Sequence, residues 1–108
     1  MTHSAVDSYG MTAERAFADV WSRATLPAKG RRLLLLGLLV GQGFDEQVEV
    51  QLDAALRTGD LSESELREVV VFLTHYAGWT RGCRLNTQVE ELIERVRRDR
   101  SDRGDPPG

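Results

Sequence analysis

The chain lacks a second cysteine, a long apolar run and an excess of positive charge, and each absence excludes something. A single cysteine cannot form a disulfide within the chain, so no internal disulfide supports the fold. The longest apolar run, LLLLGLLV at residues 33–40, is less than half of the roughly 20 residues needed to cross a bilayer. Since no basic, apolar signal segment opens the chain, we expect a cytoplasmic protein that does not enter a membrane.

The charge balance argues against a nucleic-acid partner. The formal net charge is -3 at pH 7, and in the Arg-rich stretch RVRRDRSDR the arginines alternate with aspartates. That alternation indicates a solvated helix end. With 108 residues the chain has room for one domain with a modest core, so it is a candidate for pairing with another subunit.

Helical periodicity dominates the middle of the chain, and no segment indicates a strand. We predict a flexible N-terminus at residues 1–11, a helical domain at residues 12–98 and a disordered tail at residues 99–108. The domain is predicted to be all-α and to hold five helices, at about residues 13–24, 27–41, 45–58, 62–78 and 80–98. The second helix is apolar on every side, so we expect it to be the central one.

Cap residues set these boundaries. Ser62 and Glu65 form the S-x-x-E capping box, and Gly78 is the expected stop of that helix. Other expected signals are N-caps at Thr12, Asp45 and Thr80, a first helical residue at Pro27, and a closing glycine at Gly59.

The fourth helix is apolar on two faces. One face is an ordinary core stripe, with Leu66, Val70 and Tyr76 among its members. The opposite face carries Glu68, Val71, Phe72 and His75. Since a helix that is apolar on both sides is covered on both sides, we predict a homo-oligomer with Glu68 and His75 near an interface or a cleft.

Three segments carry a resemblance to a known family: LPAKGRRLLLLGLLV, QLDAALRTG and SESELREVVVFLTHYAGW. In this order and spacing the chain, from about residue 17 to 96, resembles the carboxymuconolactone decarboxylase family of the alkyl hydroperoxidase D-like superfamily. The resemblance implies a compact all-helical fold that assembles through helix faces as trimers or hexamers. It also implies a lyase of aromatic compound catabolism that needs neither a metal nor an organic cofactor.

The chain departs from that superfamily at its functional positions. Phe44 and Gln47 stand where the redox branch has its two thiols, Gln51 where it has a histidine, and Arg32 where it has a glutamate. A dithiol peroxidase is therefore disfavoured. The decarboxylase branch usually keeps the histidine, and Gln51 cannot act as an acid or a base, although it can hydrogen-bond a ligand.

Decarboxylation of a lactone acid requires a cation for the carboxylate and donors for the developing oxyanion. Arg31 and Arg32 lie in the first turns of the second helix, where positive charge opposes the helix dipole. They form either a carboxylate clamp or solvated ion pairs with Glu46 or Glu49. Gln51 is expected to point inward, toward a ligand or toward neighbouring backbone groups.

His75 and Glu68 are two helical turns apart, or ~10.5 Å along the axis, too far for a direct bond within one helix. They are candidate catalytic residues with groups from elsewhere, His75 as proton donor and Glu68 as its orienter or as a base. The alternative is an interface histidine and a salt-bridged glutamate. Cys83, flanked by Arg81 and Arg84, is either a reactive thiol or an inert buried one.

The sequence thus favours a carboxymuconolactone decarboxylase-like enzyme that acts on a small carboxylated lactone or oxo acid. Its candidate residues are His75 and Glu68 for catalysis and Arg31, Arg32 and Gln51 for substrate binding. The alternative is a non-catalytic helical oligomer that serves as a binding or scaffold protein. A peroxidase is the least favoured of the three.

Overall fold

Four long helices follow a short helical segment in this computed structural model, which describes residues 15–16 and 18–104. The helices are α2 (Ala28–Gln42), α3 (Asp45–Thr58), α4 (Glu63–Ala77) and α5 (Trp79–Asp102). The segment before them is helical at residues 15–16 and 18–22, and no strand occurs among the described residues. The expected all-α, five-helix architecture is confirmed. The predicted flexible residues 1–11, the Thr12 cap and residues 105–108 lie outside the described part.

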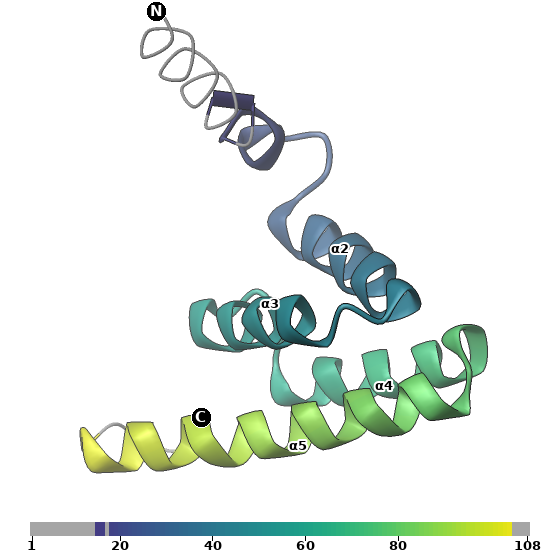
Figure 1. Cartoon of the computed structure of the whole chain (residues 1–108). Coiled ribbons are helices and arrows are strands. Elements are labelled where there is room, and N and C mark those ends of the chain that lie inside the picture. Colours follow the sequence, from purple (N-terminus) through teal and green to yellow (C-terminus); the bar gives the residue numbers. More distant parts are fainter. Residues whose placement is uncertain (1–14, 17, 105–108) are drawn as a thin grey trace, which may run out of the picture.

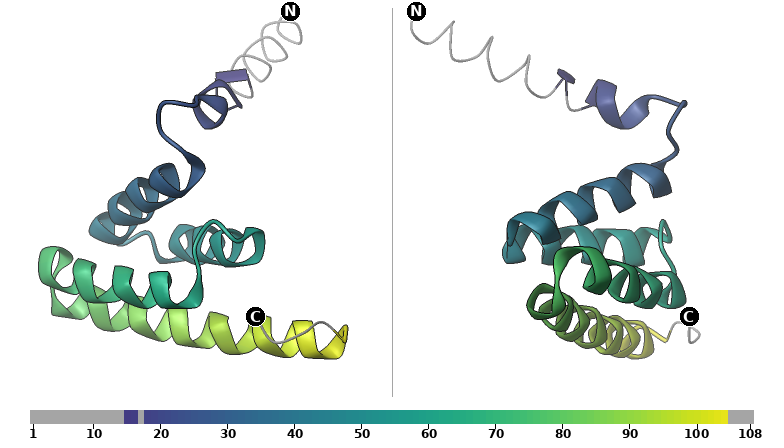
Figure 2. Two further views of the ribbon diagram at one scale, coloured as in Figure 1. Left: turned by 180° about the vertical axis from the view of Figure 1, so that it is seen from behind. Right: turned by 90° about the vertical axis from the view of Figure 1, so that its right-hand side faces the viewer.

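The helices stack in chain order. Figures 1 and 2 show the N-terminal segment standing over α2, α2 resting against α3, and the antiparallel pair of α4 and α5 beneath them. α4 and α5 lie side by side along the whole of α4, and α5 then continues alone toward the C-terminal end. None of the helices within the described ranges has the length and hydropathy of a membrane span.

The core lies between α3, α4 and α5, and α2 contributes less to it than the sequence predicted. The buried apolar side chains are Leu36, Val40, Val48, Leu52, Ala55, Leu56, Leu61, Leu66, Val70, Leu85, Val89, Leu92, Ile93 and Val96. Only two of these belong to α2, while Leu34 and Leu38 on its other side are exposed. The expectation of a central second helix is therefore wrong for the single chain, because a run of leucines does not indicate which side meets a neighbour.

Three helix ends follow the predicted signals: the start of α4 and the ends of α3 and α4. The amide of Glu65 donates to Ser62 Oγ at 3.1 Å, and the amide of Ser62 donates to Glu65 Oε1 at 2.9 Å, so the capping box is confirmed. Gly59 closes α3 with φ 82°, and Gly78 ends α4 with φ 101°. Both values favour glycine because L side chains rarely adopt positive φ.

Three predicted boundaries are wrong by about a residue, and one by a turn. The N-cap residues of α2, α3 and α5 are Pro27, Phe44 and Gly78, none of which makes a side-chain cap bond, so Asp45 and Thr80 are not caps. α5 continues to Asp102, through residues that the prediction assigned to the tail. An ion pair of Arg57 with Asp99, at 2.7 Å, joins that last part of α5 to α3.

The second apolar face of α4 is uncovered in the single chain. Val71 is 53% exposed and Phe72 is 60% exposed, as the two-faced pattern predicts. Tyr76 was expected in the core but is 78% exposed, because its ring packs against Phe72 on the outer face with centroids 4.8 Å apart. The homo-oligomer that would cover this face stays a prediction.

The contact between α4 and α5 depends on a glycine. A Cβ atom built on Gly82 would lie 2.2 Å from Thr74 Oγ1 and 2.9 Å from Thr74 Cα, so no side chain fits there. Thr74 cannot easily turn aside, since its hydroxyl donates to the carbonyl oxygen of Val70 at 2.7 Å. The close approach of the two helices therefore requires glycine at position 82.

Replacing Gly82 by alanine tests this constraint. We expect Gly82→Ala to destabilise the fold by roughly 1–3 kcal/mol, because the methyl group must push α5 away from α4. Gly41→Ala is the matched control, since its new Cβ meets nothing within 4 Å and alanine is favoured over glycine inside a helix. Thermal melting of both variants measures the difference. Equal melting temperatures for the two would contradict the account.

Ion pairs tie the surfaces of α4 and α5 together. Arg67 donates to both carboxylate oxygens of Glu90, at 2.9 and 3.0 Å, and Arg97 donates to both oxygens of Glu63. The hydrogen-bonded guanidinium of Arg97 holds the pKa of the Glu63 carboxyl below its usual range, and Arg67 does the same to the pKa of Glu90. A lowered carboxyl pKa contributes stability that is present above the ordinary value and lost as pH falls through the folded value.

We expect the double variant Arg67→Gln, Arg97→Gln to melt below the wild type at pH 7, with the gap closing as pH falls below about 4.5, the ordinary glutamate value. Melting temperatures from pH 7 to pH 3 check this. Arg98→Gln controls for loss of an arginine, since its partner Glu94 lies on the same helix. If the difference in melting temperature stays constant from pH 7 to pH 3, these ion pairs do not make the stability of the fold depend on pH.

Candidate functional site

The N-terminal end of α2 gathers the largest set of predicted site residues. Arg32 Nη1 donates to Gln51 Oε1 on α3, and Arg32 Nη2 donates to Asp60 Oδ2 in the loop after α3 at 3.1 Å. The guanidinium carbon lies 4.9 Å from the centroid of a Trp21 ring, a cation–π distance. These four residues form the Arg32 cluster, and the side chain of Arg32 is 13% exposed within it.

Arg32 was predicted to act either as a clamp for a ligand carboxylate or in a solvated ion pair with Glu46 or Glu49. The predicted ion-pair partners Glu46 and Glu49 are wrong, because the carboxylate that faces Arg32 belongs to Asp60. Gln51 is partly buried and its Oε1 accepts a hydrogen bond from Arg32, so two of the candidate binding residues meet, while their role in binding a ligand stays a prediction. Asp60 and Trp21 were not foreseen, since a single aspartate in the loop TGDLS and one tryptophan in a helical segment carry no signal of such a contact.

Arg31 lies beside this cluster and is the most unusual charged group in the described part. Its side chain is buried, with only 8% of the residue exposed, and its Nη1 atom has no hydrogen-bond partner. No carboxylate among residues 15–16 and 18–104 forms an ion pair with it. Leaving a buried cation unpaired costs several kcal/mol, so such groups usually meet an anion.

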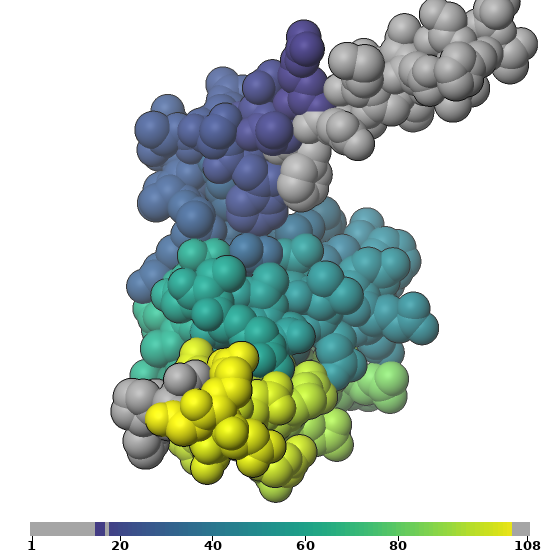
Figure 3. Space-filling model, turned by 90° about the vertical axis from the view of Figure 1, so that its left-hand side faces the viewer, coloured from purple at the N-terminus to yellow at the C-terminus, as the bar shows by residue number. Residues whose placement is uncertain are grey.

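Arg31 lines a pocket of about 650 Å³ between the N-terminal segment and α2. Its walls are mostly apolar and include Trp21, Leu26, Leu34, Leu35 and Leu38. We call this hollow the Arg31 pocket. In the space-filling view the N-terminal segment and α2 form one end of the molecule, far from the end of α5 (Figure 3).

The electrostatics of this end of α2 favour an anion. The first turn contains no acidic residue, and Pro27 provides no side-chain cap, so the helix dipole is uncompensated. Lys29 is neutralised by Glu65 at 2.6 Å, and Arg32 by Asp60. Of the three cations Lys29, Arg31 and Arg32, only Arg31 therefore has no carboxylate partner among the described residues.

The two predicted catalytic residues lie elsewhere. Glu68 lines a different, largely apolar hollow of about 680 Å³ between α2 and α4. His75 is exposed farther along α4, and its Nδ1 lies 2.9 Å from the carbonyl oxygen of Val71. No hydrogen bond or ion pair in the described part joins either residue to Arg31, Arg32 or Gln51. One chain therefore brings together the predicted binding residues but not the predicted acid and base.

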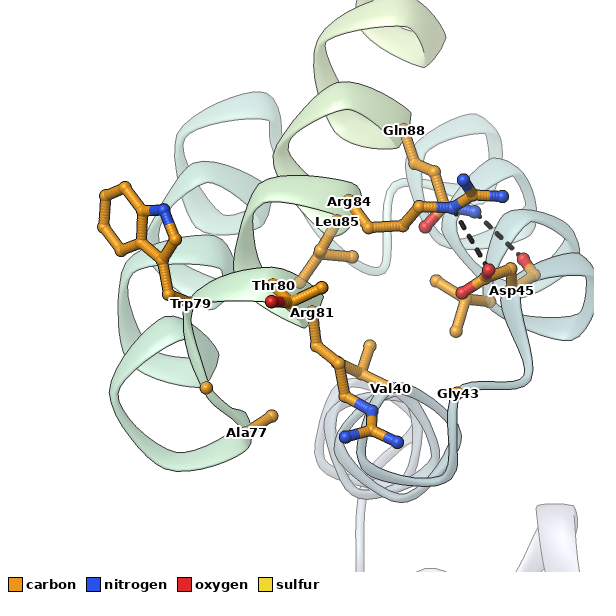
Figure 4. Close-up of a pocket in the computed structure, with 12 residues that line it drawn as sticks. Val40, Gly43, Asp45, Ala77, Trp79, Thr80, Arg81, Arg84, Leu85 and Gln88 are labelled. Carbon is orange, nitrogen blue, oxygen red and sulfur yellow. Dashed lines mark hydrogen bonds and ion pairs between the residues drawn. The ribbon is translucent and has the colours of Figure 1, made fainter.

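A third hollow, of about 590 Å³ and with more polar residues in its lining, lies where α3 and α5 begin (Figure 4). Arg84 pairs with Asp45 at 3.1 Å, and Gln88 Nε2 donates to the carbonyl oxygen of Asp45 at 2.9 Å. Arg81 extends toward Gly43 across the mouth of the hollow, and the Trp79 ring points away from it (Figure 4). Asp45, Arg84 and Gln88 pair with one another, and no polar side-chain atom of this hollow is among those that are buried without a partner, so this hollow is the weaker candidate.

Cys83 is exposed and free, so of the two alternatives for this residue the buried thiol is wrong, and its reactivity stays untested. The described chain offers no second thiol near it, and Phe44 and Gln47 occupy the positions that the resemblance assigns to thiols. Within residues 15–16 and 18–104 no group of three or more His, Cys, Asp or Glu side chains is placed to hold a metal ion.

Comparisons with known proteins point to one kind of enzyme. The 4-carboxymuconolactone decarboxylase of Acinetobacter baylyi is 32% identical over 63 residues, which are 58% of this chain and 46% of that protein. The nitrosuccinic acid decarboxylase of Metarhizium robertsii is 35% identical over 68 residues, 63% of this chain and 47% of its own length. The chain is thus distantly similar to two proteins that are named as decarboxylases.

The matched part spans about half the length of these relatives. No protein-family model matches the chain, and no solved structure matches it significantly. The comparisons therefore show a distant similarity to two proteins named as decarboxylases and nothing about the substrate.

If Arg31 serves a ligand and not the fold, removing its charge should not weaken the protein. We expect Arg31→Met to raise the melting temperature, because an apolar side chain of similar length fills the space without an unpaired charge. Arg32→Met should lower it, since this change leaves Asp60 and Gln51 without their partner. Melting curves of the two variants at pH 7 give the comparison. A clear loss of stability in Arg31→Met would assign Arg31 to the fold.

Proposed function

We propose that the chain binds a small carboxylated lactone or oxo acid at the N-terminal end of α2 and decarboxylates it, or does related acid/base chemistry on it, without a cofactor. The observation that carries this proposal is the buried guanidinium of Arg31, which faces an apolar pocket without an anionic partner. The two similar proteins named as decarboxylases add support. Cytoplasmic aromatic compound catabolism is the setting we propose.

The reaction needs little from the protein besides positioned positive charge. In a 3-oxo acid the bond between the carboxylate and the α-carbon breaks, CO₂ leaves, and the electron pair is delocalised onto the carbonyl oxygen as an enolate. A planar guanidinium can contact both the carboxylate and that oxygen, so Arg31 stays paired while the negative charge moves. A proton from water then returns to the carbon and completes the reaction.

The other residues of the site have supporting roles in this scheme. Arg32 is already paired with Asp60 and Gln51, so it holds α2 and α3 in register and adds positive potential beside Arg31. Gln51 offers its amide as a hydrogen-bonding group but exchanges no proton. We propose a catalytic role for Glu68 and His75 only in an oligomer. There, a second copy of the chain would bring them to the Arg31 pocket as base and acid.

The second candidate is a non-catalytic helical oligomer that binds or scaffolds. It is favoured by the exposed apolar side chains Val71 and Phe72 on α4 and by the separation of His75 from the Arg32 cluster. Trimers or hexamers would cover this face. A peroxidase remains disfavoured, since the described chain has one exposed thiol and no resolving partner.

Turnover of a panel of carboxylated lactones and 3-oxo acids, followed as CO₂ release, tests the proposed enzyme. We expect at least one acid to be turned over, and Arg31→Gln to lower kcat/KM about 100-fold or more because the charged contact is lost. Arg98→Gln, an exposed arginine on α5, is the matched control and should keep full activity.

Two results would overturn the enzyme proposal: no CO₂ from any acid, or full activity in Arg31→Gln. In the first case, unchanged melting in the presence of every acid would favour the scaffold over a binding protein.

A further inference from the structure

The chemical class of the acid follows from the walls of the Arg31 pocket, provided that the proposed binding of a small acid holds. Apart from Arg31, the polar residues that line the pocket are Arg23 and Thr25, both exposed on the segment before α2. The remaining lining is apolar: Val20, Trp21, Leu26, Leu34, Leu35 and Leu38. The pocket therefore offers one buried positive charge and a broad apolar surface.

A ligand that matches this pocket carries one carboxylate and an apolar body. Its carboxylate pairs with the Nη1 group of Arg31, which is buried and without a partner. Its body replaces water on the leucines and on Trp21, whose ring also suits an aromatic group. At about 650 Å³ the pocket lies within the range of sites that bind small organic molecules.

A second carboxylate on the same ligand gains nothing from these walls. Inside the pocket it would lose its water without meeting a donor, which is unfavourable for any ionised group. At the rim it would meet Arg23, which is exposed, and contacts between solvated charges contribute little. We infer that the Arg31 pocket selects monocarboxylates with a branched or ring-containing apolar body over dicarboxylates, and so differs in substrate from the similar protein that is named for nitrosuccinic acid, a dicarboxylic acid.

Binding of three related probes to the full-length protein tests this selection by calorimetry, apart from turnover. 3-Phenylpropanoate carries one carboxylate, phenylsuccinate adds a second one to the same skeleton, and 3-phenylpropanamide has none. We expect the monocarboxylate to bind at least tenfold more tightly than the dicarboxylate, and the amide to bind weakest. Arg31→Gln should weaken 3-phenylpropanoate binding at least tenfold.

A matched pair of valines tests the apolar wall. Val20 lines the pocket and is 55% exposed, while Val50 on α3 is 63% exposed and lies outside it. Val20→Asn should weaken 3-phenylpropanoate binding several-fold, and Val50→Asn should leave it unchanged. Both substitutions are at exposed positions, so neither is expected to unfold the chain.

The outcomes separate the two proposals. Equal or tighter binding of phenylsuccinate overturns the selection for monocarboxylates, and CO₂ release from any acid, lost in Arg31→Gln, would then keep the proposed function intact. Unchanged binding of 3-phenylpropanoate in Arg31→Gln overturns the inferred selection and the proposed site together. If no acid binds and none is decarboxylated, the proposed function itself fails. Binding of 3-phenylpropanoate without turnover of any 3-oxo acid keeps the inferred selectivity and leaves a binding protein.

Discussion

The close packing of α5 against α4 is the contact on which the rest of the fold depends. α5 supplies Leu85, Val89, Leu92, Ile93 and Val96 to the core, and it can approach α4 only because Gly82 has no side chain to meet Thr74. α3 then packs on this pair, and α2 packs on α3 with one side only. Because the core is complete without the outer side of α2, the N-terminal end of that helix is left to form a site.

The N-terminal end of α2 contains two adjacent arginines with different surroundings. Arg32 is paired with Asp60 and Gln51 through its two Nη groups, although its buried Nε has no partner, whereas the buried Nη1 of its neighbour Arg31 has none and no carboxylate in the described chain pairs with Arg31. Two adjacent arginines thus differ in role because they point to different surroundings. A group that costs stability and serves no contact is the usual mark of a functional position.

The helices could be predicted from the sequence where local chemistry determines them. The Ser62 capping box and the glycines at 59 and 78 act within a few residues, so they locate the ends of α3 and α4. The pairing of Arg32 with Gln51 was within reach, because both positions correspond to functional positions of the resembled family. Asp60 was not, since the loop that carries it gave no local signal.

Apart from the shifted helix boundaries, the main failures concern which neighbour a helix face meets. The leucine run predicted a central α2, and the stripe on α4 placed Tyr76 in the core, yet Leu34, Leu38 and Tyr76 are exposed in the single chain. Helical periodicity identifies an apolar face but not the element that covers it. The burial of Arg31 depends likewise on the path of the N-terminal segment, which no spacing of residues encodes.

We propose that Arg31 binds an anion that the described chain does not supply. A crystal structure of the assembled protein with an apolar monocarboxylate tests it most directly. We predict the carboxylate within hydrogen-bond distance of Arg31 Nη1, with the apolar body against Trp21 and the α2 leucines. If Arg31 instead pairs with a carboxylate of the protein itself, from its own chain or from a second copy, the account is contradicted.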